Sequence, residues 1–163
     1  MLSDRDIRRE MLSGEISILP APDDKAIQPA SVDVRLGAEF IQNGYHFSAN
    51  EFDLMPMEFI LGTLMERVAI SSRIVARIEG KSSLGRKGLG VHVTAGFVDP
   101  GWDGILTVEL FNFGDAAIHL TQGMYIAQLA FDYLNTGAIR PYGHEELSSH
   151  YQGARGVQAS ADV

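Results

Sequence analysis

The spacing of turn residues constrains the fold of this chain more than any other feature of its sequence. After Pro29, the residues Gly, Asp, Asn and Pro recur at short intervals and separate short apolar segments. Segments of this length, bounded by turn residues, favour strands, and their succession favours an all-β barrel or sandwich over alternating strand and helix units. We expect strands at Ser31–Leu36, Phe59–Leu64, Ile74–Ile78, Gly90–Thr94, Ile105–Phe113, Ala117–Leu120 and Ile126–Phe131.

One short helix is expected before this β-rich part, at residues 4–13. Ser3 is placed to cap the first turn, with Asp6 three positions on as its capping-box partner. Gly14 follows the last helical residue, where a glycine commonly ends a helix.

The end of the chain has a different character. Residues 143–163 are polar and glycine-bearing, and they show little apolar periodicity. This pattern predicts either a disordered tail or an arm that becomes ordered on a ligand.

The composition narrows the class of protein. With 163 residues, of which 45% are apolar and 21% charged, the chain matches one soluble globular domain that spans residues 1–163. A net charge of −8 and a pI near 5.0 argue against general nucleic-acid binding, which usually needs a basic face. The chain has no cysteine, so disulfides, thiolate zinc sites and thiol nucleophiles are excluded. Because it shows neither a signal peptide nor the roughly 20 apolar residues that cross a bilayer, we expect a cytoplasmic protein without membrane contact.

A basic loop interrupts this acidic sequence. From Lys81 to Val98 there are three Lys or Arg residues and no acidic one, and two serines and a glycine lie between the first two cations. Backbone N–H groups exposed by glycine, hydroxyl donors and cations together suit a polyphosphate. The loop lacks the Walker pattern G-x-x-x-x-G-K-[ST], and a solvated surface turn is the alternative.

A carboxylate within an apolar strand is the second candidate feature. Glu109 lies in the expected strand Ile105–Phe113, whose two faces are both largely apolar. A carboxylate in such a place loses hydration and needs a partner, and partial burial suits a general base. The alternative is that Glu109 lies on a solvated edge.

Three other polar residues have simpler explanations. Asp99 precedes a Pro-Gly turn, where aspartate commonly hydrogen-bonds its own backbone. His92 lies between two valines, and a histidine there is more often a satisfied core or interface residue than a catalyst. His144 begins an H-x-E fragment of the kind found in zinc deaminases, but without a P-C-x-x-C partner it indicates a solvated loop.

Motifs in several parts of the chain follow one another in the order typical of one protein family. They are Leu2–Arg8, Ile27–Gly37, Val75–Arg86, Val91–Gly101, Gly123–Met124, Ile126–Leu129, Tyr142 and Tyr151–Gly153. Together they resemble the dCTP deaminase family, within the trimeric dUTPase-like superfamily. This resemblance implies a mainly β, distorted β-barrel or jelly-roll-like fold with a short N-terminal helix and a flexible C-terminal arm. It also implies a homotrimer with active sites between subunits.

The resemblance assigns roles to individual residues. Glu109 would be the general base that activates water for attack on C4 of cytosine, with ammonia as the leaving group. Arg86 and Ser82 of a neighbouring subunit would orient Glu109 and the water. A nucleotide of the dCTP, dUTP or dTTP type would contact Lys81, Ser82, Ser83, Leu84, Gly85, Arg86, Asp99, Thr107, Val108, Glu109, Gln128, Tyr142 and His150.

Within this set, the resemblance separates phosphate, sugar and base contacts. Lys81 and Ser83 would help to hold the triphosphate. Asp99 would bind the deoxyribose hydroxyl or position a hydrolytic water, and Tyr142 would pack on the sugar or base. Gln128 and the backbone of residues 107–109 would read the base. Zinc is not expected, and Mg²⁺ would arrive on the nucleotide phosphates.

The sequence Ala95-Gly96-Phe97 bears on the product. Purely deaminating members of the family resemble Ala-His-Arg at this place, whereas members that also hydrolyse dUTP resemble the sequence found here. We therefore expect deamination of dCTP coupled to dUTP hydrolysis, with dUMP, ammonia and pyrophosphate as products. A monofunctional dCTP deaminase, a plain dUTPase and a non-catalytic nucleotide-binding trimer are the alternatives. The segment Leu110–Gly114 looks like that of a plain dUTPase, although such enzymes lack an acid at the position of Glu109.

Two departures from the family pattern favour the non-catalytic alternative. His150 stands where the family usually has a lysine, and Ala154 stands where it usually has a glutamine. Both positions would contact phosphate. The chain also lacks about a hairpin near residues 43–56, where the motifs cannot be aligned.

Overall fold

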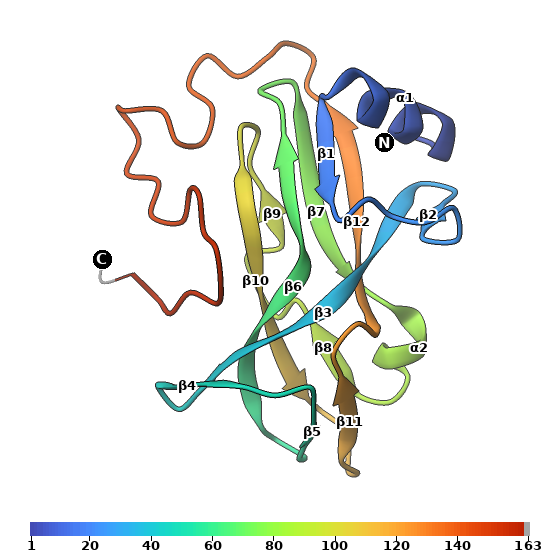
Figure 1. Cartoon of the computed structure of the whole chain (residues 1–163), viewed down its shortest axis with the longest axis vertical. Coiled ribbons are helices and arrows are strands. Elements are labelled where there is room, and N and C mark those ends of the chain that lie inside the picture. The colour runs from blue at the N-terminus through green and yellow to red at the C-terminus, as the bar shows by residue number, and fades with distance from the viewer. Residues whose placement is uncertain (162–163) are drawn as a thin grey trace.

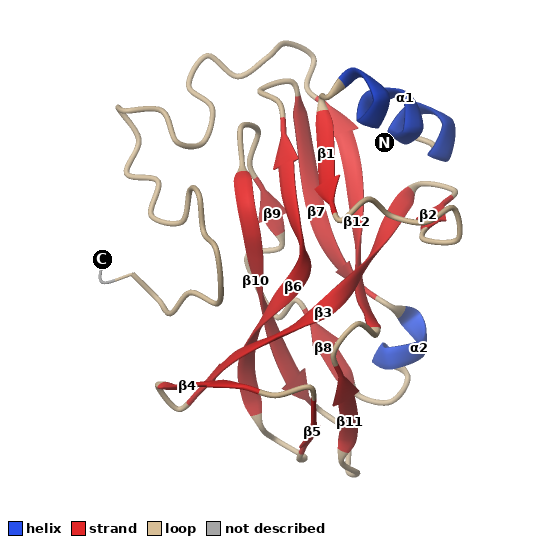
Figure 2. Ribbon diagram, in the orientation of Figure 1, coloured by secondary structure: helices blue, strands red, loops and turns tan. Residues whose placement is uncertain are grey.

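The computed structural model describes residues 1–161 and is built mainly of strands (Figure 1, Figure 2). The helices are α1 (Asp4–Ser13) and α2 (Ser82–Gly85). The strands are β1 (Ile16–Leu19), β2 (Ile27–Gln28), β3 (Ser31–Gln42), β4 (Tyr45–Ser48), β5 (Glu51–Leu54), β6 (Phe59–Ile70), β7 (Ile74–Gly80), β8 (Leu89–Val91), β9 (Phe97–Val98), β10 (Asp103–Asn112), β11 (Ile118–Thr121) and β12 (Tyr125–Tyr133).

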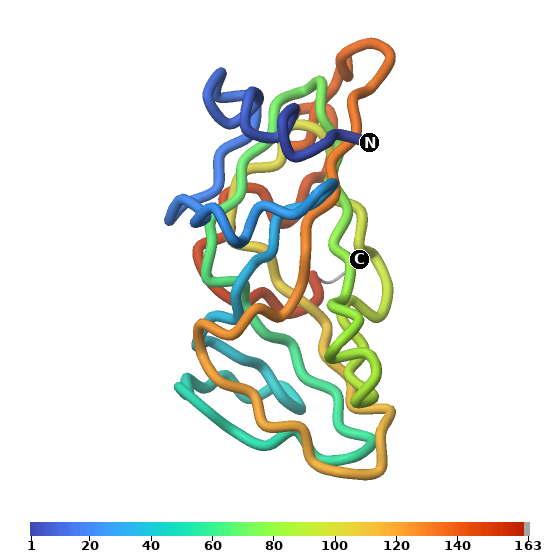
Figure 3. Tube along the Cα trace, turned by 90° about the vertical axis from the view of Figure 1, so that its right-hand side faces the viewer, coloured from blue at the N-terminus to red at the C-terminus, as the bar shows by residue number. Residues whose placement is uncertain are grey.

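Most of these strands belong to one curled sheet. Its strands follow the order β8, β10, β6, β3, β12, β7 and β9, while β1, β2 and β4 pair with strands of this path. A separate pair of strands is formed by β5 and β11. Figure 1 and the view turned by 90° in Figure 3 both place α1 at one end of the long axis and this pair at the other.

The strand β3 runs diagonally across the molecule and joins the two halves of the sheet (Figure 1). Its residues up to Arg35 pair with β12, and its residues from Leu36 pair with β6, with an irregularity between Leu36 and Phe40. Gly37 lies at this irregularity, where an added Cβ would overlap Thr63 Oγ1 and lie 3.1 Å from the Leu64 carbonyl oxygen. The close approach of β3 and β6 here therefore favours a residue without a side chain.

The apolar residues alternate along the strands and meet between the two halves of the curled sheet. This alternation is clearest in β10, where every second residue is buried. Burial of one large aliphatic or aromatic side chain contributes about 1.5–3 kcal/mol to folding, so this cluster is the main stabilising part of the protein. Its fully buried members include Val32, Val34, Leu36, Phe40, Leu54, Ile60, Leu64, Val108, Leu110, Leu120, Leu129 and Phe131.

Each of the seven expected strands overlaps a strand of the structure. The largest extensions are those of β3, which continues to Gln42, and β6, which continues to Ile70. Of the expected strand Gly90–Thr94, only residues 90 and 91 belong to β8, and residues 92–94 form a loop. The five strands that were not expected (β1, β2, β4, β5 and β9) have two to four residues each. Two of these, β4 and β5, lie in residues 43–56, where the family motifs cannot be aligned. The second helix, α2, was also not expected, since its residues had been assigned to a loop.

The helix expected at the N-terminus is confirmed with its caps. The Ser3 side chain accepts a hydrogen bond from the Asp6 N–H, and Gly14 ends the helix with a left-handed φ of 82°. Ile7 is fully buried and fixes the helix to the core. Neither helix within residues 1–161 is long and apolar enough to cross a membrane.

The C-terminal arm, residues 143–161 of the described chain, contains no helix or strand but lies against the body. The Gly153 N–H donates to the Asp103 carbonyl, and the Ile105 N–H donates to the Ala154 carbonyl, both at 2.8 Å. The arm therefore extends the sheet along the first residues of β10. It uses the edge of β10 with which β8 pairs only from Leu110 onward. Backbone pairing thus holds a segment that has little apolar surface of its own. Asp162 and Val163 lie outside the described residues.

Candidate active site

Glu109 lies at the edge of the core, within the strand that the sequence predicts at residues 105–113. Along β10, Val108 and Leu110 point into the core, so Glu109 points to the opposite, partly open face with its side chain 22% exposed. The Thr94 N–H donates to Glu109 Oε2 at 2.7 Å, and the Thr94 hydroxyl lies 3.3 Å from both carboxylate oxygens. The carboxylate is thus half-buried and held in place by a backbone donor, as a positioned general base requires.

His92 lies directly beside this carboxylate. Its Nδ1 accepts a hydrogen bond from the Glu109 backbone N–H at 2.9 Å, so the proton of the neutral ring is carried by Nε2. Nε2 is 3.9 Å from Glu109 Oε2. Burial lowers the pKa of His92, and the negative charge of Glu109 opposes part of this change. We therefore describe the pair as a neutral imidazole facing a carboxylate, not as an ion pair.

A cavity of about 520 Å³ opens in front of Glu109. Its volume lies within the range of ordinary small-molecule sites. The ring of Trp102 packs against that of Tyr142, with centroids 5.6 Å apart, and both line this cavity. The arm supplies part of the wall. Polar and aromatic side chains on the wall include Asp99, Thr107, Tyr142, Trp102, Tyr151 and Gln158.

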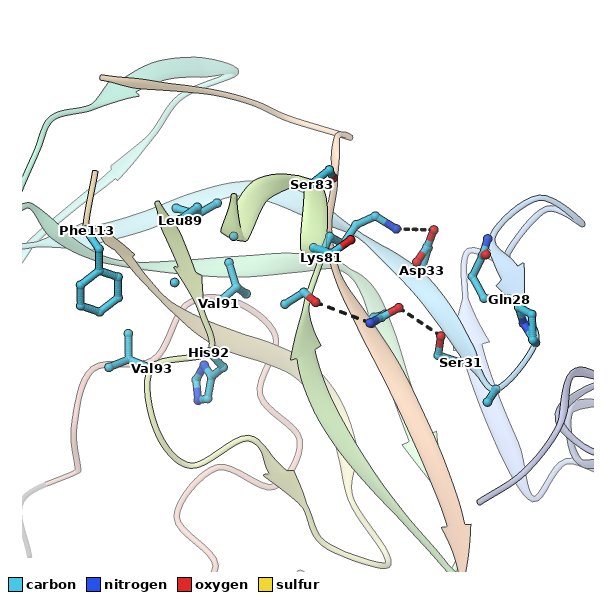
Figure 4. Close-up of a pocket in the computed structure, with 17 residues that line it drawn as sticks. Gln28, Ser31, Asp33, Lys81, Ser83, Leu89, Val91, His92, Val93 and Phe113 are labelled. Atoms are coloured by element: carbon cyan, nitrogen blue, oxygen red, sulfur yellow. Dashed lines mark hydrogen bonds and ion pairs between the residues drawn. The ribbon is translucent and has the colours of Figure 1, made fainter. Parts of the chain in front are cut away.

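The basic loop lines a second cavity, of about 740 Å³, which Figure 4 shows in close-up. Lys81, Ser82, Ser83 and Gly85 reach it from α2 and the residue before that helix. Gln128 lies in this cavity rather than in that of Glu109. The Ser31 hydroxyl donates to Gln128 Oε1 at 3.2 Å, and Gln128 Nε2 lies 3.5 Å from the Gly80 carbonyl.

The charge of Lys81 is already paired within the chain. Lys81 Nζ lies 2.5 Å from Asp33 Oδ2, as Figure 4 shows, and 5.7 Å from the centre of the Tyr125 ring. The Asp33 residue is only 8% exposed, and its Oδ1 has no hydrogen-bond partner among residues 1–161. The loop therefore offers a phosphate its hydroxyls and backbone more directly than the Lys81 ammonium.

The structure divides the expected site residues into separate groups. Those around Glu109 are Asp99, Thr107 and Tyr142, whereas those around the basic loop are Lys81, Ser82, Ser83, Gly85 and Gln128. His92 lines both cavities. The residues that are not among those lining either cavity of the described chain are Arg86 and His150, which are exposed, and Leu84 and Val108, whose side chains are buried in the core.

Two residues that touch Glu109 were not selected from the sequence as catalytic. These are His92 and Thr94, which lie in the loop that follows β8. The sequence gives only a weak signal for them, because the register that places Val91 opposite Leu110 is what brings this loop next to Glu109. The sequence predicts that His92 is a core or interface residue whose ring is satisfied by a hydrogen bond. The ring does accept a hydrogen bond, and the donor is the backbone N–H of Glu109.

The segment Ala95-Gly96-Phe97 packs closely against β7. The Gly96 carbonyl accepts a hydrogen bond from the Ile78 N–H at 2.7 Å, and a Cβ on Gly96 would lie 2.9 Å from the Ile78 carbonyl oxygen. A larger residue at position 96 would push these two backbones apart. Ala95 and Phe97 both line the Glu109 cavity, so a change here would alter its shape.

Comparison with known proteins decides the family. A family model described as dCTP deaminase-like matches residues 1–134. The chain belongs to this family. The matched residues include the lining of both cavities except for Tyr142 and the residues of the arm, all of which follow residue 134.

Named relatives of this dCTP deaminase-like chain cover nearly all of it. A protein of Haloarcula marismortui named dCTP deaminase is 45% identical over 183 residues, covering 98% of this chain and 93% of the relative. A protein of Halobacterium salinarum named dCTP deaminase, dUMP-forming, is 42% identical with the same coverage. The resemblance stated from the sequence is therefore confirmed.

Solved structures agree with this fold. The 2′-deoxycytidine 5′-triphosphate deaminase of Agrobacterium tumefaciens matches with a TM-score of 0.68 and 20% identity, over 80% of this chain and 47% of that one. An EIAV dUTPase matches with a TM-score of 0.58 and 17% identity, over 81% of this chain and 99% of that one. The expected dUTPase-like β fold is confirmed.

Proposed function

We propose that this protein deaminates dCTP by hydrolysis and then hydrolyses the resulting dUTP to dUMP and pyrophosphate. The first step consumes one water and releases ammonia, and the second consumes another water. The observation that carries the proposal is the Glu109 carboxylate, half-buried beside neutral His92 and open to a cavity of about 520 Å³. Relatives named dCTP deaminase, dUMP-forming, support the coupled reaction.

Glu109 is positioned to move the protons of the deamination. It takes a proton from a water that attacks C4 of cytosine and passes a proton to the leaving amino group, so that ammonia departs. The Thr94 N–H fixes one carboxylate oxygen during these transfers. Because Nδ1 of His92 accepts the Glu109 N–H, the neutral ring carries its proton on Nε2, 3.9 Å from Glu109 Oε2, and has no free lone pair to act as a competing base.

Asp99 and Tyr142 are suited to the sugar and the second reaction. Both line the Glu109 cavity, and Asp99 carries an exposed carboxylate. In the proposal, Asp99 binds the deoxyribose hydroxyl or positions the water that attacks the phosphate chain. Tyr142 packs against the sugar or base, and its hydroxyl accepts the Tyr151 N–H at 3.1 Å, which links it to the arm.

A homotrimer would complete the site. In a single chain the Glu109 cavity lacks the basic loop, and Arg86 is exposed at the end of α2. In the proposed assembly, Arg86 and Ser82 of one subunit face Glu109 of the next and contact the triphosphate. Gln128 lies with the loop, so its contact with the base in this assembly stays a prediction.

Mg²⁺ would enter with the nucleotide and neutralise part of the triphosphate charge. Among residues 1–161, no three His, Asp or Glu side chains are grouped to hold a metal ion by themselves. Asp33, the acidic residue that lines the loop cavity, is already paired with Lys81, so in this proposal the nucleotide phosphates themselves hold the Mg²⁺. We also place the protein in the cytoplasm, where such a reaction would supply dUMP.

One assay separates this function from its alternatives. The protein is incubated with dCTP or dUTP in the presence of Mg²⁺, and the products are separated by ion exchange. Formation of dUMP and ammonia from dCTP is expected. Accumulation of dUTP indicates a monofunctional deaminase, and dUMP from dUTP with unchanged dCTP indicates a plain dUTPase. Binding without turnover indicates the non-catalytic alternative, which the residues His150 and Ala154 favour.

A further inference from the structure

The C-terminal arm is anchored at a point outside the cavity that it helps to enclose. Glu39 is an exposed residue of β3 and does not line the Glu109 cavity. Its Oε2 accepts a hydrogen bond from the Val157 N–H at 3.3 Å. The Val157 residue itself is only 8% exposed, although most of its neighbours in the arm are open to solvent.

The residue before Val157 shows how closely Glu39 approaches the arm. A Cβ on Gly156 would lie 2.3 Å from Glu39 Oε2, far inside a normal contact distance. The end of the Glu39 side chain therefore occupies the place that a Cβ would take at position 156. Any larger residue there would displace this end from its position beside the Val157 N–H.

The anchor lies between two contacts that belong to the cavity wall. Before it, the Ala154 carbonyl accepts the Ile105 N–H at 2.8 Å, and after it, the Gln158 N–H donates to Thr107 Oγ1 at 3.0 Å. Ala154, Gln158 and Thr107 all line the Glu109 cavity. Between these contacts, Glu39 supplies the anchoring side chain from outside β10.

We propose that Glu39 is a positioning residue that fixes the arm as a wall of the Glu109 cavity. The proposal rests on the proposed function, because it makes substrate affinity depend on a carboxylate that does not touch the substrate. Loss of the anchor frees the segment between Ala154 and Gln158, and the cavity opens to solvent on that side. Binding then weakens more than the proton transfers at Glu109 do.

Two substitutions remove the same contact in different ways. Glu39→Ala deletes the acceptor, and Gly156→Ala pushes it away. Each should raise the KM for dCTP by about three- to tenfold, the range of a modest charge-assisted hydrogen bond, with a smaller change in kcat. Because both act on one contact, the double variant should be no worse than either single variant. Glu39→Gln keeps an oxygen acceptor for the Val157 N–H and should restore most of the affinity.

The position of the arm is measured separately from turnover. Arg155 lies within the anchored segment, so the rate of tryptic cleavage after Arg155, followed by mass spectrometry, reports release of the arm. The emission of Trp102, the only tryptophan in the chain, is a second readout, because its ring lies against the same wall. Glu51→Ala is the matched control, since Glu51 is an exposed carboxylate of β5 that contacts His119.

Faster cleavage and changed emission in Glu39→Ala and Gly156→Ala, but not in Glu51→Ala, support the proposal. It is overturned if Glu39→Ala matches the wild type in cleavage and in KM, or if the effects of the two single substitutions multiply in the double variant. If the wild type does not turn over dCTP, the proposed function fails, and the cleavage and emission experiments still decide the role of Glu39.

Discussion

The backbone N–H of Glu109 donates to Nδ1 of His92, while the other ring nitrogen of His92 faces the Glu109 side chain at 3.9 Å. One residue thus uses its backbone to set the tautomer of the ring that faces its own carboxylate. The contact exists because β8 pairs with β10 and Val91 lies opposite Leu110. It places a buried imidazole beside the carboxylate that the proposed reaction uses.

Removing the acid–base function of Glu109 should stop the chemistry without stopping binding. Glu109→Gln keeps the size of the side chain and can still accept the Thr94 N–H. We expect the release of ammonia from dCTP to fall by about 10²–10⁴-fold or more, since general acid–base catalysis contributes on this scale. Ammonia release is measured directly, and dCTP binding is measured by calorimetry. Near-normal ammonia release by this variant would falsify the role of Glu109.

The buried histidine should make stability depend on pH. Burial lowers the pKa of His92 in the folded protein below its ordinary value of 6.5, so the unfolded chain takes up the proton at a higher pH than the folded chain does. The free energy of unfolding should therefore decrease as the pH falls below about 6.5. The negative charge of Glu109 limits this decrease.

Urea unfolding at pH 5 and pH 7 tests this effect in the wild type and in His92→Asn. The asparagine oxygen can accept the Glu109 N–H in place of Nδ1, but it does not titrate in this range. The loss of stability between pH 7 and pH 5 should be smaller in the variant than in the wild type. Equal losses would show that His92 does not contribute.

A buried asparagine should matter for stability more than for chemistry. Asn112 is 0% exposed, and its Nδ2 donates to the carbonyls of Leu54 and Ala116 at 2.8 and 2.9 Å, while its Oδ1 accepts the Gly114 N–H at 2.9 Å. Asn112→Ala leaves the buried Leu54 carbonyl and two partly exposed backbone groups, the Ala116 carbonyl and the Gly114 N–H, without their side-chain partners. We therefore expect a loss of about 1–3 kcal/mol in the free energy of unfolding. The matched control is Asn135→Ala at an exposed position, which should change stability by less than about 0.5 kcal/mol. A similar small change in both variants would contradict the prediction.

The product should change when an arginine enters the Glu109 cavity. Phe97 and Asp99 line the same cavity, and Phe97→Arg would bring a guanidinium close to the Asp99 carboxylate. An Asp99 paired in this way no longer positions a water, so dUTP should accumulate from dCTP while ammonia release continues. Phe97→Leu is the control that changes size without charge. The ratio of dUTP to dUMP, measured by ion exchange, should rise at least severalfold in the arginine variant only.

The strands were predictable where one face is clearly apolar. Ile105–Phe113 and Ile126–Phe131 carry enough apolar residues to show their burial in the sequence, and both are confirmed as β10 and β12. The short strand β9 has two residues and too few side chains to show a period. The helix α2 was missed because its Ser-Ser-Leu-Gly sequence has weak helix propensity and depends on its position after β7.

The sequence indicated the residue types of the site better than their grouping. Glu109, Asp99 and Tyr142 do share one cavity, but Gln128 lies with the basic loop, because β12 places it opposite Asp33 of β3. Which residues become neighbours depends on how strands far apart in the chain pair with one another. This pairing cannot be read from a single sequence. An arm was among the expectations from the sequence, but its contacts were not, since backbone hydrogen bonds and one buried valine make them.

The separation of the basic loop from Glu109 in one chain leads to the last prediction, that active sites form between subunits. Arg86→Ala and Glu109→Gln should each be inactive alone, because every site of each homotrimer lacks one of the two groups. In trimers mixed at equal amounts, some sites combine Glu109 of an Arg86→Ala subunit with Arg86 of a Glu109→Gln subunit. Random assembly leaves about a quarter of the sites intact, so activity should return to about that fraction of the wild type. The mixture is prepared by unfolding and refolding together, and mixed trimers are verified by native mass spectrometry with one subunit tagged. If mixed trimers form and activity stays absent, Arg86 and Glu109 act within one chain and the shared site is wrong.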